Sequence, residues 1–451
     1  MKGIISNDLD LQSQRPRGPG FFEKGTEVNI RTADYDDNVL WYTLDNGIKV
    51  KALEVELGLY SNLLPDDLNQ FYICYRKLDE NNAPIADKMS DAPDTLYFSL
   101  LSSPEIRVTD WSPQIFANAV SQSVSEMDRK HVFVYMHGFD WEPGLKLDLA
   151  AKFVQSFANH SENSIAKVLY FGWPSFGGRN VADDRAIAHG QHFTQKGLFV
   201  YLDRLAEALR AQEKTLNLIV HSFGHQLLNG MINPGEGNTQ PIPEGIFENI
   251  FLMAPDITHL AIQKNGVRLR NPKPGSGNHY YYNYAPLKKL GRKVHIYHNS
   301  ADYLLYMGTK KSNGNNDNGN FDTNPNLDGI TTDYRTLGNF GKDIFDEPGS
   351  TLNLEPGFNF IDVQKLISDA DDSPVNCLYY PFRNNTDAAI AKAKNGNYSG
   401  ITLFDSFWDR DLLMPHHQYL FTCKPVVDDI LKQLNTVESD TQPLNEEAPI
   451  V

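Results

Sequence analysis

The chain has 451 residues, which allows one large domain with insertions or several smaller domains. Its hydrophobic fraction of 41% and its charged fraction of 22% are typical of a folded globular protein rather than a disordered one. The net charge of −16 repels phosphate backbones and anionic lipid surfaces, so the composition argues against nucleic acid as a partner.

The sequence shows no pattern of secretion, membrane insertion or disulfide cross-linking. The first twenty residues contain no apolar core of signal-peptide length, and no apolar run approaches the ~18 residues that span a bilayer. The three cysteines have neither paired spacing nor a CxxC motif. We therefore expect a cytoplasmic protein without a transmembrane segment, although export that needs no cleavable signal would also fit this pattern.

Residues 1–125 are expected to form a β-rich region or small domain. Two strand-like runs flank Asp45-Asn46-Gly47, and Asn and Gly tolerate the positive φ of a tight hairpin turn. The segments "FYICYRKL" and "DTLYFSLL" have the composition of further strands. No chemical motif occurs here, so the region could extend the following sheet or bind a protein partner.

Residues 126–434 show the pattern of an α/β domain. Five short apolar runs, each followed by a helical pattern, predict a mostly parallel sheet with helices on both faces. The runs are "HVFVYM", "AKVLYF", "LNLIV", "NIFLM" and "KVHIYH". Polar and Gly/Pro-rich segments predict insertions near residues 264–290 and 308–358. The acidic tail, residues 435–451, is expected to be disordered.

Ser222 is the strongest candidate nucleophile. It lies between an apolar strand and a helical pattern in "LNLIVHSFGHQLL", where a tight turn can expose a hydroxyl beside unpaired backbone N–H groups. The motif G-x-S-x-G is present only in its second half, because Val220 occupies the first glycine position. A bulky residue there is expected to crowd the turn.

The partners of such a serine follow it along the chain, first an acid and then a histidine. Asp302 ends a predicted strand and is the favoured acid, with Asp256, one strand earlier, as the second candidate. Only two histidines follow Asp302, the adjacent His416 and His417, so the base is expected to be one of them.

The oxyanion requires two backbone N–H donors. Phe223 supplies one as the residue after the nucleophile, and the turn after the first strand of the α/β domain supplies the other. In that turn Gly138 allows close approach of the backbone, and Phe139 or Asp140 offers the N–H group.

Seven short motifs in chain order, between roughly residues 130 and 420, resemble those of bacterial α/β-hydrolases of largely unknown function. They read "YMHGF", "GWPSFG", "VHSFG", "MAPDI", "YHNSAD", "YRTLGNFG" and "PHHQY". The resemblance implies an α/β-hydrolase fold with Ser222 as nucleophile, Asp302 as acid and His417 as base, because "HQY" aligns with the family's His-Ser-Tyr. His416 takes the family's glycine position, which leaves the choice between the two histidines open.

We therefore expect a serine hydrolase, similar to esterases and lipases, that cleaves a small-molecule or lipid ester through an acyl-enzyme and needs no cofactor. Two alternatives remain: a catalytically silent binding protein on the same scaffold, and an exported lipid-cleaving effector. No metal site is expected, because His221 and His225 lack the glutamate of a zinc helix. The aromatic segment "HYYYNYAP", residues 279–286, could form a lid or an ordinary packed loop.

Overall fold

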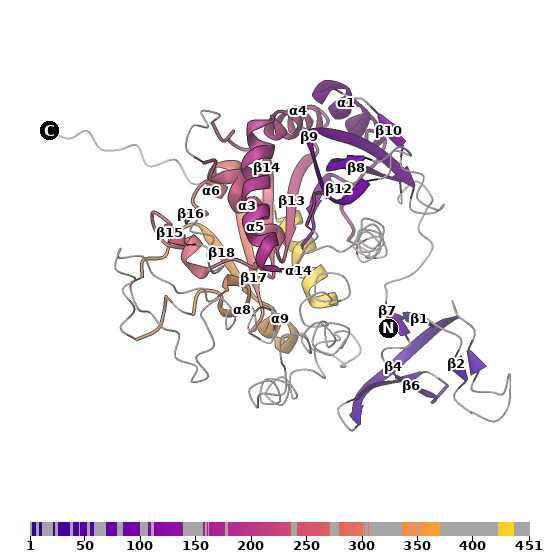
Figure 1. The fold of residues 1–451 in the computed structure, drawn as a ribbon. Helices are drawn as coiled ribbons and strands as arrows, with labels where there is room; N and C mark the ends of the chain where they lie inside the picture. Colours follow the sequence, from indigo (N-terminus) through magenta and orange to yellow (C-terminus); the bar gives the residue numbers. More distant parts are fainter. Residues whose placement is uncertain are drawn as a thin grey trace.

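The computed structural model describes residues 2–5, 9–10, 21–22, 26–36, 39–44, 46–51, 55–57, 69–78, 84–99, 107–109, 112–138, 157, 160, 162–175, 179–235, 241–270, 279–300, 302, 305, 336–343, 345–348, 350, 352–369 and 423–436. A nine-stranded sheet forms the centre of the molecule, in the order β10-β9-β8-β12-β11-β13-β14-β17-β18 (Figure 1). Its strands are β8 (Asn69–Leu78), β9 (Pro84–Ser99), β10 (Arg107–Thr109), β11 (His131–Met136), β12 (Ile165–Gly172), β13 (Thr215–His221), β14 (Phe247–Met253), β17 (Gly291–His298) and β18 (Phe358–Asp362).

The sheet is parallel from β8 to β18, and β9 and β10 add an antiparallel edge. The five predicted strands therefore occur where the apolar runs indicated, and the prediction of a mostly parallel sheet is confirmed. β18 was not predicted, because its sequence "FNFID" alternates with polar residues at the border of a predicted insertion. All carboxyl ends of the parallel strands meet at one edge of the sheet, where a ligand site is expected.

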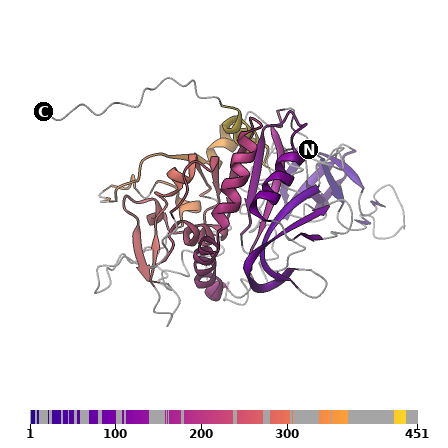
Figure 2. The ribbon, with the colours of Figure 1, turned by 90° about the horizontal axis from the view of Figure 1, so that it is seen from above.

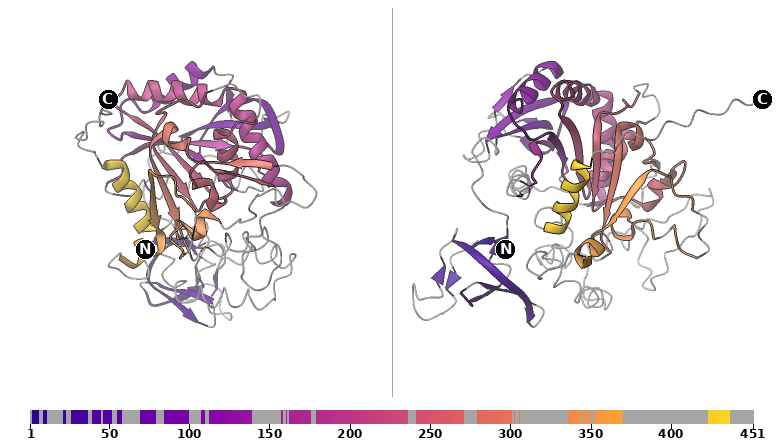
Figure 3. Two further views of the ribbon diagram at one scale, coloured as in Figure 1. Left: turned by 90° about the vertical axis from the view of Figure 1, so that its left-hand side faces the viewer. Right: turned by 180° about the vertical axis from the view of Figure 1, so that it is seen from behind.

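Helices cover both faces of the sheet, which explains why its strands are apolar throughout. Two clusters of buried apolar side chains lie on opposite faces of the sheet. On β11, Val132 and Val134 pack into one cluster, and Phe133 and Tyr135 pack into the other. The first face carries α1 (Pro113–Ser123), α3 (Arg179–Gln195), α4 (Leu198–Arg210) and α5 (Gly224–Ile232). The second carries α14 (Lys424–Asn435), the yellow helix over the sheet in the right panel of Figure 3.

The helices follow from their sequence patterns. In α4 the predicted row Leu198, Leu202, Leu205 and Leu209 is fully buried, and Gly197, at φ +87°, separates this helix from α3. In α1 the Ser112 side chain accepts a hydrogen bond from the Ile115 N–H, which caps the first turn. The predicted helix before β12 lies almost entirely outside the described residues.

Helices α3 and α5 cross in direct backbone contact. A Cβ atom on Gly190 of α3 would lie 2.1 Å from the Leu227 carbonyl oxygen, and one on Gly230 of α5 would lie 2.1 Å from the Ile187 carbonyl oxygen. Neither glycine can therefore carry a side chain. This crossing fixes the helix that follows Ser222 against its neighbour.

The N-terminal residues form a separate five-stranded sheet in the order β6-β5-β4-β1-β7. Its strands are β1 (Lys2–Ile5), β4 (Glu27–Asp36), β5 (Val39–Leu44), β6 (Lys49–Lys51) and β7 (Val55–Leu57), and β2 (Leu9–Asp10) pairs with β3 (Phe21–Phe22). The predicted hairpin at Gly47 is present, with φ +81° at the glycine and antiparallel pairing of β5 with β6. Strands β8 to β10 extend the central sheet instead. The domain boundaries after residues 125 and 434 stay predictions.

The aromatic segment packs against the core. It forms β16 (His279–Tyr282), which pairs with β15 (Val267–Arg270) to give the salmon strands at the lower left of Figure 2. Tyr282 and Tyr284 are buried, whereas Tyr281 is 43% exposed. The 3-10 helix η3 (His259–Ile262) precedes β15 in the chain, and α6 (Leu287–Leu290) leads from β16 into β17. Of the two readings left open, the packed segment fits this arrangement.

The second predicted insertion, 308–358, lies mainly outside the described residues. Its last part is ordered around α8 (Leu337–Phe340), and β18 and α9 (Val363–Asp369) follow. α8 packs against the carboxyl ends of β14 and β17 through the backbone bonds described below.

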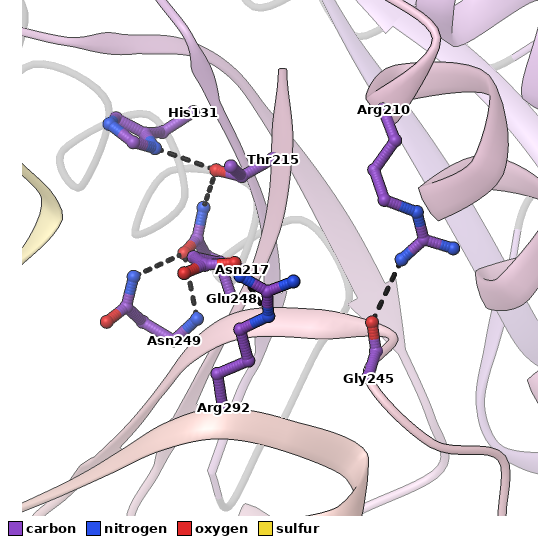
Figure 4. A network of polar contacts seen from close by, with 8 residues as sticks. All are labelled: His131, Arg210, Thr215, Asn217, Gly245, Glu248, Asn249 and Arg292. Atoms are coloured by element: carbon purple, nitrogen blue, oxygen red, sulfur yellow. Dashed lines mark hydrogen bonds and ion pairs between the residues drawn. The ribbon is translucent and has the colours of Figure 1, made fainter. Parts of the chain in front are cut away.

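A row of polar side chains, buried except for the half-buried Thr215, crosses the sheet, and Figure 4 shows its members on β11, β13 and β14. His131 Nδ1 lies 2.7 Å from Thr215 Oγ1, which also accepts from Asn217 Nδ2 at 3.0 Å. Asn249 Nδ2 donates to Asn217 Oδ1 at 3.0 Å, and His295 Nε2 lies 3.1 Å from Asn249 Oδ1. Four strands are thus joined by side-chain bonds as well as by their backbones.

The partners determine the tautomer of His295. Asn249 Nδ2 donates to Asn217 Oδ1, so the atom of Asn249 that faces His295 is the amide oxygen, which can only accept. His295 Nε2 therefore donates to Asn249 Oδ1, and His295 Nδ1 accepts from Asn359 Nδ2 at 3.1 Å. His295 is therefore neutral within this row. Burial, with a smaller contribution from Lys293, lowers the pKa of His295 to about 4.

Candidate active site

Ser222 occupies the turn between β13 and α5 in a left-handed backbone conformation, with φ +52°. This conformation is strained for a residue with a side chain and recurs at functional turns. The Ser222 N–H donates to the Met253 carbonyl at the end of β14, at 2.9 Å. The strand, the strained serine and the helix together have the geometry of a nucleophile elbow.

Three donors hold the carbonyl oxygen of Ser222. The backbone N–H of His225 donates at 3.1 Å, the His225 Nδ1 at 2.6 Å, and the Asp256 N–H at 3.3 Å. His225 is thus a buried side chain that fixes the turn. Hydrogen bonds from α5 and from the loop after β14 thus stabilise the strained backbone conformation of Ser222.

Val220 lies against the start of α5, and the elbow forms with this bulky residue in place. Its side chain is buried in the core on the helix-covered face that includes α5, 3.3 Å from the position of a Cβ on Gly224. That Cβ would lie only 2.7 Å from the His137 carbonyl oxygen. The elbow therefore needs a glycine at 224, while the valine at 220 fills core space.

Gly138, after β11, lies directly against the serine. A Cβ at this position would be 2.8 Å from Ser222 Cβ, 3.2 Å from its Oγ and 3.0 Å from the His221 carbonyl oxygen. Only a glycine allows this approach, as the sequence indicated. Phe139 and Asp140, the candidate donors that follow it, lie outside the described residues.

A stack of aromatic rings supports the two turns. Trp173 lies between His137, at a centroid distance of 5.6 Å, and Phe223, at 6.0 Å. Its indole Nε1 donates to the His137 carbonyl at 3.1 Å, and its backbone N–H donates to His137 Nε2 at 3.4 Å. His137 Nδ1 therefore carries the proton and donates to the Gly138 carbonyl at 2.7 Å. Trp173 of the Trp-Pro-Ser turn thus supports the strand end before Gly138 and the turn of the serine.

Asp302 lies after β17 and is fully buried. Its Oδ1 accepts a hydrogen bond from the Leu305 N–H at 3.1 Å, as in a helix N-cap. Its own N–H donates to the Asn299 carbonyl at 2.9 Å. The strand order β13-β14-β17 places the loop of this acid two strands from the serine, at the same edge of the sheet.

Asp256, the second candidate acid, is nearer along the sheet, since it follows β14. Its N–H binds the Ser222 carbonyl, and its carbonyl oxygen accepts from Gln226 Nε2 at 2.8 Å. Its backbone thus links the nucleophile turn to the first turn of α5.

Asn339 of α8 is a residue of this site that the sequence did not single out. The side-chain amide of Asn339 lies against the backbone of the loop that carries Asp302. Asn339 belongs to the quoted motif "YRTLGNFG", to which the sequence assigned no role. The position of that motif among the strand ends could have drawn attention to it.

His416 and His417, the two candidate bases, lie outside the described residues. Within the described part of the chain, no three metal-ligating side chains gather into a group. Among the helices that the structure describes, none is long and apolar enough to cross a bilayer.

The mostly parallel sheet, its helices on both faces and the strained serine after β13 define an α/β-hydrolase fold. Residues 112–309 match the model of a family described as alpha/beta hydrolase of unknown function (DUF900). Among solved structures, the chain is similar to an acylaminoacyl peptidase of Pyrococcus horikoshii, with 11% identity over 65% of this chain and a TM-score of 0.24. The alignment spans 45% of that peptidase. A comparison with curated protein sequences found no match.

Proposed function

We propose that this protein is a serine hydrolase that cleaves carboxylic esters. The observation that carries the proposal is Ser222 at φ +52°, between a buried strand and a helix, with Gly138 against its hydroxyl. The strained turn is held by hydrogen bonds from α5 and from the end of β14 and its following loop, which favours a functional reason for the strain.

In this mechanism His417 removes the proton of Ser222, and the serine oxygen attacks the acyl carbon of the ester. The N–H groups of Phe223 and Phe139 bind the oxyanion, and Asp302 orients the imidazole. The alcohol leaves with the proton from the imidazolium, and water then releases the acid from the acyl-enzyme. The reaction requires no cofactor.

The elbow also bears on the alternative of a silent binding protein. A bulky residue at 220 in place of the motif's glycine would favour that alternative if it distorted the turn, but Val220 is buried in the core and the turn forms beside it. The adjacent His416 and His417, which also depart from the family's pattern, lie outside the described residues. We therefore favour the enzyme over the silent scaffold.

A fluorophosphonate probe tests the proposal, because it bonds only to an activated serine. We expect covalent labelling of the wild type that is lost in Ser222→Ala, with one adduct found on the peptide that carries Ser222. A wild type that stays unlabelled over hours, while its fold is intact by circular dichroism, would contradict the proposal. For the base, His417→Ala should abolish labelling and His416→Ala should retain it.

A further inference from the structure

We infer that Asn339 positions the catalytic acid by holding the loop of Asp302 through its side-chain amide. The inference rests on the proposed function, since it assigns a role within the same site. It concerns a residue 37 positions beyond the acid in the sequence, on a different element.

Within the described residues, the three side-chain hydrogen bonds of Asn339 all lead to the loop of Asp302. Its Nδ2 lies 3.3 Å from the Asn299 carbonyl oxygen, 3.1 Å from that of Ser300 and 3.0 Å from that of Asp302. The side chain is 5% exposed, so these bonds form without competition from water. The two N–H groups of this amide are thus shared among three carbonyl oxygens of the single loop that carries the acid.

The backbone next to Asn339 is fixed just as closely. Gly338 accepts from the Asn299 N–H at 2.8 Å and donates to the Pro255 carbonyl at 2.9 Å. A Cβ on Gly338 would lie 2.5 Å from the Pro255 nitrogen and 2.5 Å from Leu305 Cδ1. The start of α8 is therefore held between the strand ends of β14 and β17, and its amide has a defined position from which to bind.

The same contacts connect the acid loop to the nucleophile. The loop after β14 binds Gly338 through Pro255, and its next residue, Asp256, donates its N–H to the Ser222 carbonyl. Ser222 in turn donates to the Met253 carbonyl. α8 thus sets the acid loop in a fixed relation to the turn of the serine, and the amide of Asn339 completes this link on the side of the acid.

A displaced acid has a specific kinetic consequence. A carboxylate beside the base favours the imidazolium and raises the pKa of the histidine, by about 1–3 units at close range. The acidic limb of the pH profile reports that pKa in the free enzyme. Loss of the Asn339 amide should therefore move the acidic limb of the labelling rate to lower pH, whereas a loss of folded protein lowers the rate equally at every pH.

The test measures the second-order rate of fluorophosphonate labelling from pH 4.5 to 9 for the wild type, Asn339→Ala, Asn339→Ser and Asp302→Asn. We expect a fall of about 10- to 100-fold in Asn339→Ala with an acidic limb at lower pH, since small misplacements in a site cost rates of this order. Asn339→Ser keeps one donor and should lie between the alanine variant and the wild type. In the Asp302→Asn background, Asn339→Ala should add little, because both changes act on the same group.

Asn217→Ala is the matched control. Asn217 is also buried and its amide also donates to more than one acceptor, but it lies in the amino-terminal half of β13, away from the serine. We expect lower stability with an unchanged acidic limb. The same limb shift in Asn217→Ala would overturn the positioning role.

The remaining outcomes also decide the question. An Asn339→Ala variant with the wild-type rate and limb, in an enzyme labelled at Ser222, would overturn the inference and leave the proposed function standing. A wild type that is never labelled overturns both. If Asn339→Ala and Asn339→Ser both fail to fold, the amide supports the fold as a whole and the specific role for the acid is rejected.

Discussion

Gly138 and Ser222 are so close that a methyl group on the glycine would lie 2.8 Å from the Cβ of the serine. The two residues follow the ends of neighbouring parallel strands, β11 and β13, and the contact is possible because one of them has no side chain. The missing side chain leaves room beside the hydroxyl. In the proposed mechanism this is where the carbonyl of the ester would lie.

Gly138→Ala should therefore impair the site more than the fold. The added methyl group meets the His221 carbonyl oxygen at 3.0 Å and Ser222 Oγ at 3.2 Å, so one of the two turns has to move. We expect labelling by the fluorophosphonate to slow by about 100-fold, the cost of a misplacement near 1 Å. Gly291→Ala is the control, because its Cβ would meet Ile250 at a similar 2.7 Å at the other end of the sheet, where a flexible side chain can give way. Equal rates in the two variants would contradict this account.

A second prediction separates strain from catalysis at Ser222. Both Ser222→Ala and Ser222→Gly should be inactive, because neither has a hydroxyl. The glycine variant should be more stable than the alanine variant by about 1 kcal/mol, since glycine adopts the left-handed region without a steric penalty. Urea unfolding of the two proteins measures this difference. A glycine variant that is the less stable of the two would show that φ +52° stores no strain here.

Much of this fold could be predicted from the sequence because its strands are covered on both faces. Such strands form unbroken apolar runs, as "HVFVYM" and "LNLIV" do, and each is visible without knowledge of its neighbours. β18 has no such run and joins the sheet only through its pairing with β17. Its position depends on a partner strand that is distant in the sequence.

The candidate site was predictable only in part, for a related reason. Ser222 and Asp302 each follow an apolar run, so the sequence marks them directly. Asn339 acts through contacts with a loop that precedes it by 37 residues, and no local pattern distinguishes it from other asparagines. The effect of Val220 could not be predicted from the sequence, because it depends on how the buried side chain packs against the start of α5.

Val220→Ala tests whether that residue acts as core packing. Val220 is fully buried in the core on the helix-covered face, so its truncation should cost about 2 kcal/mol of the free energy of unfolding through lost burial and a small cavity. Labelling of Ser222 should persist at a rate close to that of the wild type. A variant that gains activity several-fold would instead indicate that the valine does crowd the elbow.

The buried row through His295 predicts that the protein loses stability in mild acid. The pKa of His295 is lowered to about 4 in the folded state from an ordinary value of 6.5, so the unfolded chain binds more protons between these values. The stabilisation is thus complete above about pH 6.5 and is lost as the pH falls to about 4. A shift of this size corresponds to about 3 kcal/mol.

Protonation has a structural reason to be unfavourable at this position, because His295 Nδ1 accepts from the Asn359 amide and a proton there would face another donor. His295→Gln cannot titrate, so its free energy of unfolding should fall less than that of the wild type between pH 6.5 and 4, by about 3 kcal/mol. Urea unfolding at several pH values measures both slopes. At pH 7.5 the variant should be the less stable protein, since a glutamine cannot replace both ring nitrogens in the bonds to Asn249 and Asn359. Parallel curves for the two proteins would show that His295 does not contribute to the acid sensitivity.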